Sequence, residues 1–232
     1  FILPTFLFYK NLIFNKKIIF LSLTPFLFIL AIPFFLIYSD NYSDKKKEIN
    51  IDAYQILNPI NNKDIKKINQ NIINLINSSN SDYIIFAENN FPFLVDRDDL
   101  SSLSNLISKE KKIIIGATSL KDNDYYNSFI LVENDQIQIF DKQILVPFGE
   151  FLPFRKYLKF MEFISGSVDF KNGNKERILI TNDNIKVLPI ICYEIIFEQI
   201  FNNINNKDID ILINITNDSW FGDKVGPYQH FY

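Results

Sequence analysis

The stretch Pro189-Ile190-Ile191-Cys192-Tyr193-Glu194-Ile195-Ile196-Phe197 places the chain's single cysteine between an apolar run typical of a strand and an apolar run typical of a helix. A strand that turns sharply into a helix lifts the residue at the bend clear of the backbone, and the free N–H groups of the helix end point towards it. Such a helix end favours a thiolate and can hold an oxyanion, so Cys192 is a candidate nucleophile. The plainer alternative is a small buried hydrophobic side chain.

Strands and helices alternate on both sides of this stretch. Apolar residues at helical spacing predict helices at Ile65–Ile76, Leu100–Ile107 and, after the cysteine, Ile195–Ile204. Apolar runs bounded by turn residues predict strands at Ile49–Ile56, Tyr83–Ala87, Lys112–Ser119, Asn127–Val132, Gln136–Asp141, Arg177–Thr181, Lys186–Ile191 and Ile209–Ile215. The pattern predicts an α/β fold with helices outside the sheet.

Composition narrows the function classes. The chain has 232 residues, of which 47% are hydrophobic, so it can bury a real core. A formal net charge of −3 gives no sign of nucleic-acid binding. One cysteine and one histidine exclude a disulfide framework and an ordinary zinc site, and no metal or cofactor is expected.

The beginning of the chain predicts a membrane segment. Ile18–Tyr38 is an uncharged apolar run of about 21 residues, enough to cross a ~30 Å hydrocarbon core. Lys10, Lys16 and Lys17 precede it and favour a cytoplasmic N-terminal end, although Lys45–Lys47 beyond the other end weakens this orientation. The expected organisation is the end of a truncated membrane span and a cytoplasmic loop at 1–17, a transmembrane helix at 18–38, a linker at 39–48 and a C-terminally incomplete catalytic domain at 49–232.

Three predicted strands end in an ionisable residue followed by loop signals, namely Glu88, Lys142 and Cys192. Ligands of α/β proteins bind at the carboxyl ends of the strands, so we expect these side chains to meet. Glu88 could take the thiol proton, and Lys142 with the Tyr193 N–H could hold the oxyanion. The long segment Asp141–Asp169, rich in Pro and Gly, is predicted to be a functional loop.

Longer motifs carry a family resemblance. The segments Phe140–Phe154, Ile191–Glu194, Thr216–Asp223 and Gly226–His230 resemble, in order, motifs of the apolipoprotein N-acyltransferases, the membrane branch of the carbon–nitrogen hydrolase (nitrilase) superfamily. The similarity covers Ile49–Tyr232. It implies a nitrilase-like αββα sandwich preceded by the transmembrane helix. It also implies a catalytic Glu–Lys–Cys triad formed by Glu88, Lys142 and Cys192. The supporting residues that it implies are Glu150, Tyr193 and Glu194. The substrate contacts that it implies are Asn127, Trp220 and Phe221.

The resemblance also implies an activity and a location. The enzyme would move an acyl chain from a phospholipid, through a thioester on Cys192, to the amino group of a diacylglyceryl-cysteine lipoprotein, without metal or cofactor. It would be a multi-pass protein of the bacterial inner membrane with its catalytic domain on the periplasmic side. Two alternatives stay open: a membrane-anchored amidase-like hydrolase and a catalytically inactive binding domain. His230 is expected to be structural.

The sequence departs from the family pattern in three places. Ala87 stands where a proline usually precedes the triad glutamate, which predicts a looser turn before Glu88. Only Gln55 and Pro59 survive of a short pattern after the first strand, and a tryptophan usual shortly after it is missing. These differences bear on lipid contacts and on the placing of the Glu88 carboxylate.

Overall fold

The structure is a computed structural model that describes residues 48–56, 64–106, 111–134, 136–162, 168–174, 176–202, 204 and 209–217. The chain divides into two units, Phe1–Glu48 and Ile49–Tyr232, and every described helix and strand belongs to the second. The expected membrane segment Ile18–Tyr38 lies outside the described residues. Among the helices within them, none has the length and apolar character required to cross a membrane.

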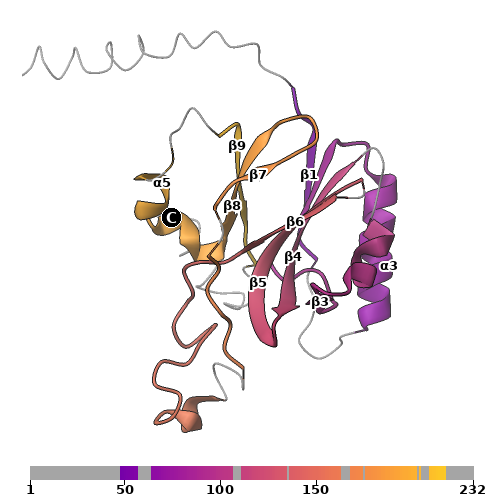
Figure 1. The fold of residues 1–232 in the computed structure, drawn as a ribbon. Helices are drawn as coiled ribbons and strands as arrows, with labels where there is room; N and C mark the ends of the chain where they lie inside the picture. The colour runs from indigo at the N-terminus through magenta and orange to yellow at the C-terminus, as the bar shows by residue number, and fades with distance from the viewer. Residues whose placement is uncertain are drawn as a thin grey trace, which may run out of the picture. The chain divides into compact units, whose positions relative to one another are not determined.

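Two sheets form the centre of the second unit (Figure 1). The larger has the order β1-β2-β4-β5-β6 with β3 also beside β4, and the smaller has the order β7-β8-β9. β1, β2 and β4 are parallel, β4, β5 and β6 form an antiparallel meander, and β9 is parallel to β8. The strands are β1 Ile51–Tyr54, β2 Tyr83–Phe86, β3 Val95–Asp96, β4 Lys112–Lys121, β5 Asp124–Glu133, β6 Gln136–Asp141, β7 Leu179–Ile180, β8 Lys186–Ile191 and β9 Ile211–Ile215.

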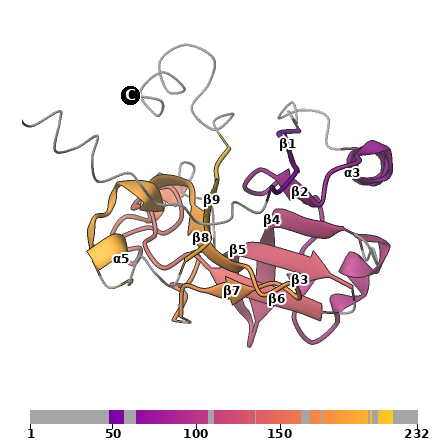
Figure 2. The ribbon, with the colours of Figure 1, turned by 90° about the horizontal axis from the view of Figure 1, so that it is seen from above.

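Helices lie on both outer sides of the sheets, with α3 on one side and α5 on the other (Figures 1 and 2). The α3 helix begins after Asp64, whose side chain accepts a 3.2 Å hydrogen bond from the Lys67 amide and so caps its first turn. The described helices are α3 Ile65–Ser78 and α5 Gln199–Asn202, with 3₁₀ helices η1 Leu100–Leu106, η2 Lys159–Met161 and η3 Cys192–Ile196.

The two faces of the larger sheet belong to different cores because successive strand residues point to opposite faces. On β4, Ile113 and Ile115 pack with α3 and η1, whereas Ile114 packs with residues of the smaller sheet such as Val187 and Ile213. The larger sheet is therefore covered by helices on one face and by the smaller sheet on the other. This is the nitrilase-like layering that the resemblance implies; beyond the smaller sheet, the described residues contribute only η3 and α5.

Some predicted elements differ from the observed ones. The helix predicted at Ile195–Ile204 is split into η3 and α5, because Phe197 between them is extended, with φ −88° and ψ 100°. The second predicted helix, Leu100–Ile107, is the 3₁₀ helix η1, and of Arg177–Thr181 only Leu179 and Ile180 form a strand. The short strand β3 was not predicted, since two residues carry no periodicity.

Candidate active site

The side chains of Glu88, Lys142 and Cys192 meet in one buried cluster. Each follows the carboxyl end of a strand: Glu88 the end of β2, Lys142 the end of β6, and Cys192 the end of β8. Lys142 Nζ lies 3.7 Å from Glu88 Oε1, and the Cys192 thiol interacts electrostatically with both groups. Their exposed fractions are 5%, 1% and 7%. Burying two charged groups costs desolvation free energy unless they compensate each other. The pairing of Glu88 and Lys142 at this edge of the sheets offsets that cost.

The Glu88 turn is packed against β4 at Gly116. A Cβ at position 116 would lie 2.5 Å from Glu88 Cα and 2.7 Å from the Ala87 carbonyl oxygen, so only glycine allows this approach. The Phe91 amide then donates to the Gly116 carbonyl at 3.1 Å, where the chain passes from β2 towards β3. Gly116 thereby fixes where Glu88 leaves the sheet.

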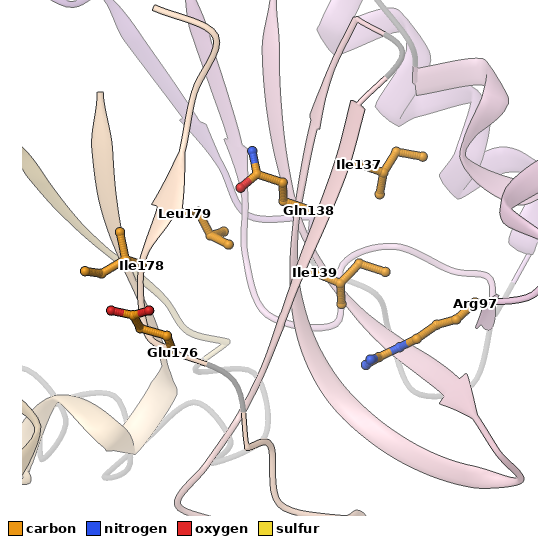
Figure 3. A pocket seen from close by; sticks show the side chains of 7 residues that line it. All are labelled: Arg97, Ile137, Gln138, Ile139, Glu176, Ile178 and Leu179. Carbon is orange, nitrogen blue, oxygen red and sulfur yellow. The ribbon is translucent and has the colours of Figure 1, made fainter. Parts of the chain in front are cut away.

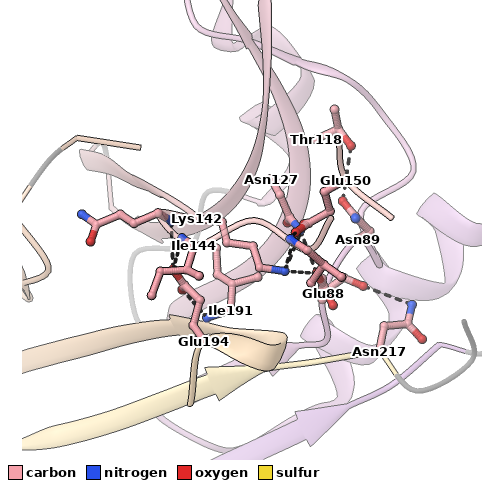
Figure 4. Close-up of polar contacts among 12 residues, drawn as sticks. Glu88, Asn89, Thr118, Asn127, Lys142, Ile144, Glu150, Ile191, Glu194 and Asn217 are labelled. Carbon is pink, nitrogen blue, oxygen red and sulfur yellow. Dashed lines mark hydrogen bonds and ion pairs between the residues drawn. The ribbon is translucent and has the colours of Figure 1, made fainter. Parts of the chain in front are cut away.

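Hydrogen bonds anchor the Glu88 turn on both sides. The Ala87 amide donates to the Tyr54 carbonyl at 3.1 Å, a bond that proline could not make. The Asn217 side chain donates to the Glu88 carbonyl at 3.1 Å (Figure 4), and Asn90, fully buried, exchanges two hydrogen bonds with the backbone of Ile56. The predicted looseness before Glu88 is therefore wrong, because Ala87 contributes a bond of its own.

Asn127 and Glu150 complete a polar network around Lys142 (Figure 4). Asn127 Nδ2 donates to Glu88 Oε1 and to Glu150 Oε1, both at 2.7 Å. Lys142 Nζ lies 3.0 Å from Glu150 Oε1 and 2.9 Å from Oε2, and the Val146 amide donates to Oε2 at 2.9 Å. Glu150 thus holds the ammonium in place, while Asn127 bridges the two carboxylates; a supporting role of Glu150 in catalysis stays a prediction.

Cys192 stands at a strained bend. Its φ is 55°, a conformation that non-glycine residues adopt rarely and that clusters at functional sites. The residue before it ends β8, and Cys192 itself begins η3. The predicted strand–bend–helix at the cysteine is confirmed, with a five-residue 3₁₀ turn in place of a regular α-helix.

Glu194 is fully buried and receives hydrogen bonds from three backbone amides. Gln143 and Ile144, which follow Lys142, donate to Oε1 at 2.8 and 3.0 Å, and Ile191, which precedes Cys192, donates to Oε2 at 3.1 Å (Figure 4). The Arg177 guanidinium donates to the two oxygens at 2.8 and 2.9 Å. Sequence reasoning singled out Glu194 by resemblance but missed Arg177, which looked like an ordinary charged residue at the start of a strand.

The buried cluster perturbs its own titration. Burial raises the pKa of Glu88 above its usual value, against the opposing effects of the Lys142 ammonium and the Asn127 hydrogen bond. Burial and the Glu88 carboxylate raise the pKa of Cys192 to about 11. Burial opposes the charge of Lys142, but the Glu88 and Glu150 carboxylates outweigh it and raise the pKa. The expectation that the bend favours a resting thiolate is therefore wrong, and the thiol requires a base.

The remaining predicted residues are placed differently. Tyr193 is 44% exposed and its ring contacts that of Phe197 edge-on, with centroids 6.4 Å apart. Trp220, Phe221 and His230 lie outside the described residues. Asn217 was missed as an individual residue, although it belongs to a motif quoted for the resemblance, and its amide joins Gln55 to the Glu88 turn through a 3.1 Å hydrogen bond.

A pocket beside β6 lies apart from these residues (Figure 3). Two of its polar side chains have partners within the protein: Arg97 pairs with Asp141, and Gln138 bonds both backbone groups of Ile180. Arg97, Ile137, Gln138, Ile139, Glu176, Ile178 and Leu179 line it. None of the predicted site residues that the structure describes does so, and the cluster at Cys192 remains the candidate active site.

Solved structures share the fold. The chain is similar to a glutamine-dependent NAD+ synthetase from Acinetobacter baumannii, with a TM-score of 0.59, 19% identity, and coverage of 80% of this chain and 35% of that one. It is also similar to a carbon-nitrogen hydrolase from Helicobacter pylori G27, with a TM-score of 0.54, 17% identity, and coverage of 79% and 65%. At these identities the likeness concerns the fold alone.

Sequence comparisons are more specific. The chain is 36% identical over 165 residues to the apolipoprotein N-acyltransferase of Rickettsia typhi, covering 66% of this chain and 32% of the relative. It is 36% identical over 173 residues to that of Wigglesworthia glossinidia brevipalpis, covering 68% and 33%. The chain thus spans about a third of the length of these relatives. The family model for carbon-nitrogen hydrolases matches residues 55–232. The chain therefore belongs to the carbon–nitrogen hydrolase family.

Proposed function

We propose that the chain is the catalytic part of an apolipoprotein N-acyltransferase. Its substrates are a phospholipid acyl donor and the N-terminal diacylglyceryl-cysteine of a lipoprotein. The observation that carries the proposal is the meeting of Glu88, Lys142 and Cys192 at the carboxyl ends of three strands. The similarity to named relatives supports this reaction among those that a thiol, a carboxylate and an ammonium can perform.

In the first half-reaction, the Cys192 sulfur attacks the ester carbonyl of the phospholipid while its proton passes to Glu88. A carboxylate with a raised pKa is a better base for this transfer, and the high pKa of the thiol makes the base necessary. Lys142 Nζ and the Tyr193 N–H stabilise the tetrahedral oxyanion. Collapse of the intermediate breaks the ester C–O bond, and Glu88 returns the proton to the lysophospholipid that leaves.

In the second half-reaction, the amino group of the lipoprotein cysteine attacks the Cys192 thioester. Glu88 takes a proton from the attacking nitrogen, the oxyanion is held as before, and the C–S bond breaks. The proton then restores the Cys192 thiol. The result is an amide on the acceptor and an unchanged enzyme, which is ping-pong chemistry without a metal or cofactor.

Exposed aromatic residues support a lipid substrate. The segment after Lys142 exposes Phe148, Phe154, Tyr157 and Phe160, with exposed fractions of 40%, 78%, 78% and 71%. Aromatic rings gathered on a surface loop suit the interface between lipid and water. The predicted membrane span at Ile18–Tyr38 would keep the domain at the bilayer surface, on the periplasmic side of the bacterial inner membrane.

The proposal is tested with the full-length protein in vesicles of phospholipid and a synthetic diacylglyceryl-cysteine peptide. The expected product is the peptide with a third acyl chain on its amino group, detected by mass spectrometry. Release of free fatty acid without acylated peptide would identify a hydrolase, and the absence of both products would identify a binding domain. The variant Cys192→Ser serves as the inactive control.

A further inference from the structure

Arg177 and Glu194 connect the two halves of the candidate active site. Glu194 accepts hydrogen bonds from the two amides that follow Lys142 and from the Ile191 amide that precedes Cys192. The turn that carries the ammonium and the bend that carries the thiol are thus tied to a single carboxylate. That carboxylate is fully buried, so its charge needs a partner.

The partner is Arg177, whose contacts use the planar fork of the guanidinium. Its two terminal nitrogens donate to both oxygens of Glu194 at 2.8 and 2.9 Å. One of them also donates to the Pro189 carbonyl at 3.1 Å, and the other to Gln143 Oε1 at 3.0 Å. Its Cζ lies 4.7 Å from the centre of the Phe140 ring. A lysine carries the same charge as a point and cannot satisfy these acceptors together.

We propose that Arg177 is a positioning residue for the acyl transfer: by fixing Glu194, it sets the position of the Lys142 ammonium relative to the Cys192 sulfur. Pro189 lies on β8 and Gln143 directly follows Lys142, so the guanidinium reaches both sides of the site even without Glu194 as intermediary. It lies outside the network formed by Glu88, Asn127 and Glu150. The proposal rests on the proposed function where it is tested by the rate of thioester formation. It does not rest on that function where it is tested by chemical modification of the Cys192 thiol.

The test compares Arg177→Lys and Arg177→Met with the parent in the full-length protein. The control is Lys112→Met, which removes a partly buried cation from two carboxylates, Glu133 and Asp183, each 3.6 Å away, at the first residue of β4 and outside the network of Glu88, Lys142 and Cys192. Two pseudo-first-order rate constants are measured with reagent in excess, well below the unfolding temperature of every variant, so that both report on the folded protein. One is thioester formation on Cys192 with phospholipid, and the other is alkylation of Cys192 by iodoacetamide as a function of pH.

For Arg177→Met we expect thioester formation to slow by about 10²-fold, the loss typical of a catalytic group misplaced by roughly 1 Å. KM for phospholipid should stay near the parent value. Alkylation should become faster and its midpoint should fall below that of the parent, because a looser turn admits water to the buried thiol. Arg177→Lys should lie between Arg177→Met and the parent. The control should lower the unfolding temperature while leaving both rate constants unchanged.

Unchanged rate constants in both Arg177 variants would overturn the proposal and make the ion pair merely structural. Should Arg177→Met not fold, the double variant Arg177→Met/Glu194→Gln leaves no unpaired buried charge and must still show slow thioester formation and fast alkylation. A parent protein that forms no thioester would refute the proposed function instead, and the alkylation profiles would still decide the role of Arg177.

Discussion

The Asn127 side-chain nitrogen lies 2.7 Å from Glu88 Oε1, between the candidate base and a second buried carboxylate. The same nitrogen donates to Glu150 Oε1 at 2.7 Å, so one amide with two hydrogens separates two carboxylates that share one ammonium, that of Lys142. An amide is suited to this place because it supplies two donors and no charge. The resemblance assigns Asn127 to substrate binding, but its contacts are those of a residue that organises the base.

Asn127→Asp should therefore impair the base more than it alters shape. The substitution replaces a donor with a third carboxylate, which disfavours ionisation of Glu88 and moves its pKa further up. Thioester formation should slow at neutral pH and recover in part as the pH rises. The control Asn74→Asp, on α3, should follow the parent profile. A profile for Asn127→Asp that is lower but not displaced along the pH axis would contradict this account.

Gly116→Ala should fold yet lose most of its activity. Its Cβ would lie 2.5 Å from Glu88 Cα, and because the three nearest atoms all belong to the backbone, the turn must move and take the carboxylate with it. Gly149→Ala is the matched control, since its Cβ would meet its nearest atom at 3.6 Å, an ordinary contact. The two variants should differ in the rate of thioester formation. Equal activity in both would mean that the position of Glu88 tolerates displacement.

The raised pKa of Glu88 predicts where activity is lost at low pH. Thioester formation requires the ionised carboxylate, so the acidic limb of the rate profile should have its midpoint above 4.5, the ordinary value for glutamate. Glu88→Gln should remove that limb along with most of the rate. The parent and the Lys112→Met protein should both show this acidic limb. A midpoint at or below 4.5 would exclude Glu88 as a buried base.

The raised pKa of Glu88 also makes the stability of the folded protein depend on pH. Because the folded state raises the pKa of Glu88, it binds the proton more tightly than the unfolded chain does. This contribution to stability is complete below the unfolded value of 4.5 and is lost as the pH rises through the folded pKa. Relative to Glu88→Gln, the parent should therefore lose stability across that interval, as measured by denaturant unfolding at a series of pH values.

Lys142→Met should lose rate for two reasons. It removes an oxyanion donor, which typically costs a factor of about 10²–10³ in rate. It also leaves Glu88 and Glu150 without their shared cation, which raises the pKa of Glu88 further and moves the acidic limb to higher pH. The kcat and KM values for phospholipid separate a loss of catalytic rate from a loss of phospholipid binding. A change confined to KM would instead make Lys142 a headgroup contact.

The sequence predicted the meeting of the site residues better than their surroundings. Glu88, Lys142 and Cys192 each follow the carboxyl end of a strand, where ligands of α/β proteins bind, so their proximity followed from position, although β8 lies in the smaller sheet and β2 and β6 in the larger one. Their catalytic roles stay a prediction, as do the membrane span and the roles of Trp220 and Phe221.

Contacts between residues far apart in the sequence are not predicted by local sequence patterns. Arg177 pairs with Glu194, seventeen positions away, across a bend that helical periodicity did not anticipate. The predicted helix at Ile195–Ile204 counted Phe197 as part of an apolar stripe, whereas its extended backbone ends η3. Local patterns predict which residues are buried, but they do not predict which buried charge meets which.

The covalent intermediate tests the account most directly. The full-length protein is incubated with phospholipid in the absence of acceptor, and intact mass and peptide mapping are recorded before and after hydroxylamine. The account predicts one added acyl mass on Cys192 that hydroxylamine removes, no adduct in Cys192→Ser, and slow formation in Glu88→Gln. A protein that transfers acyl chains to the acceptor without acyl mass on Cys192, or that carries it on another residue, would contradict the account.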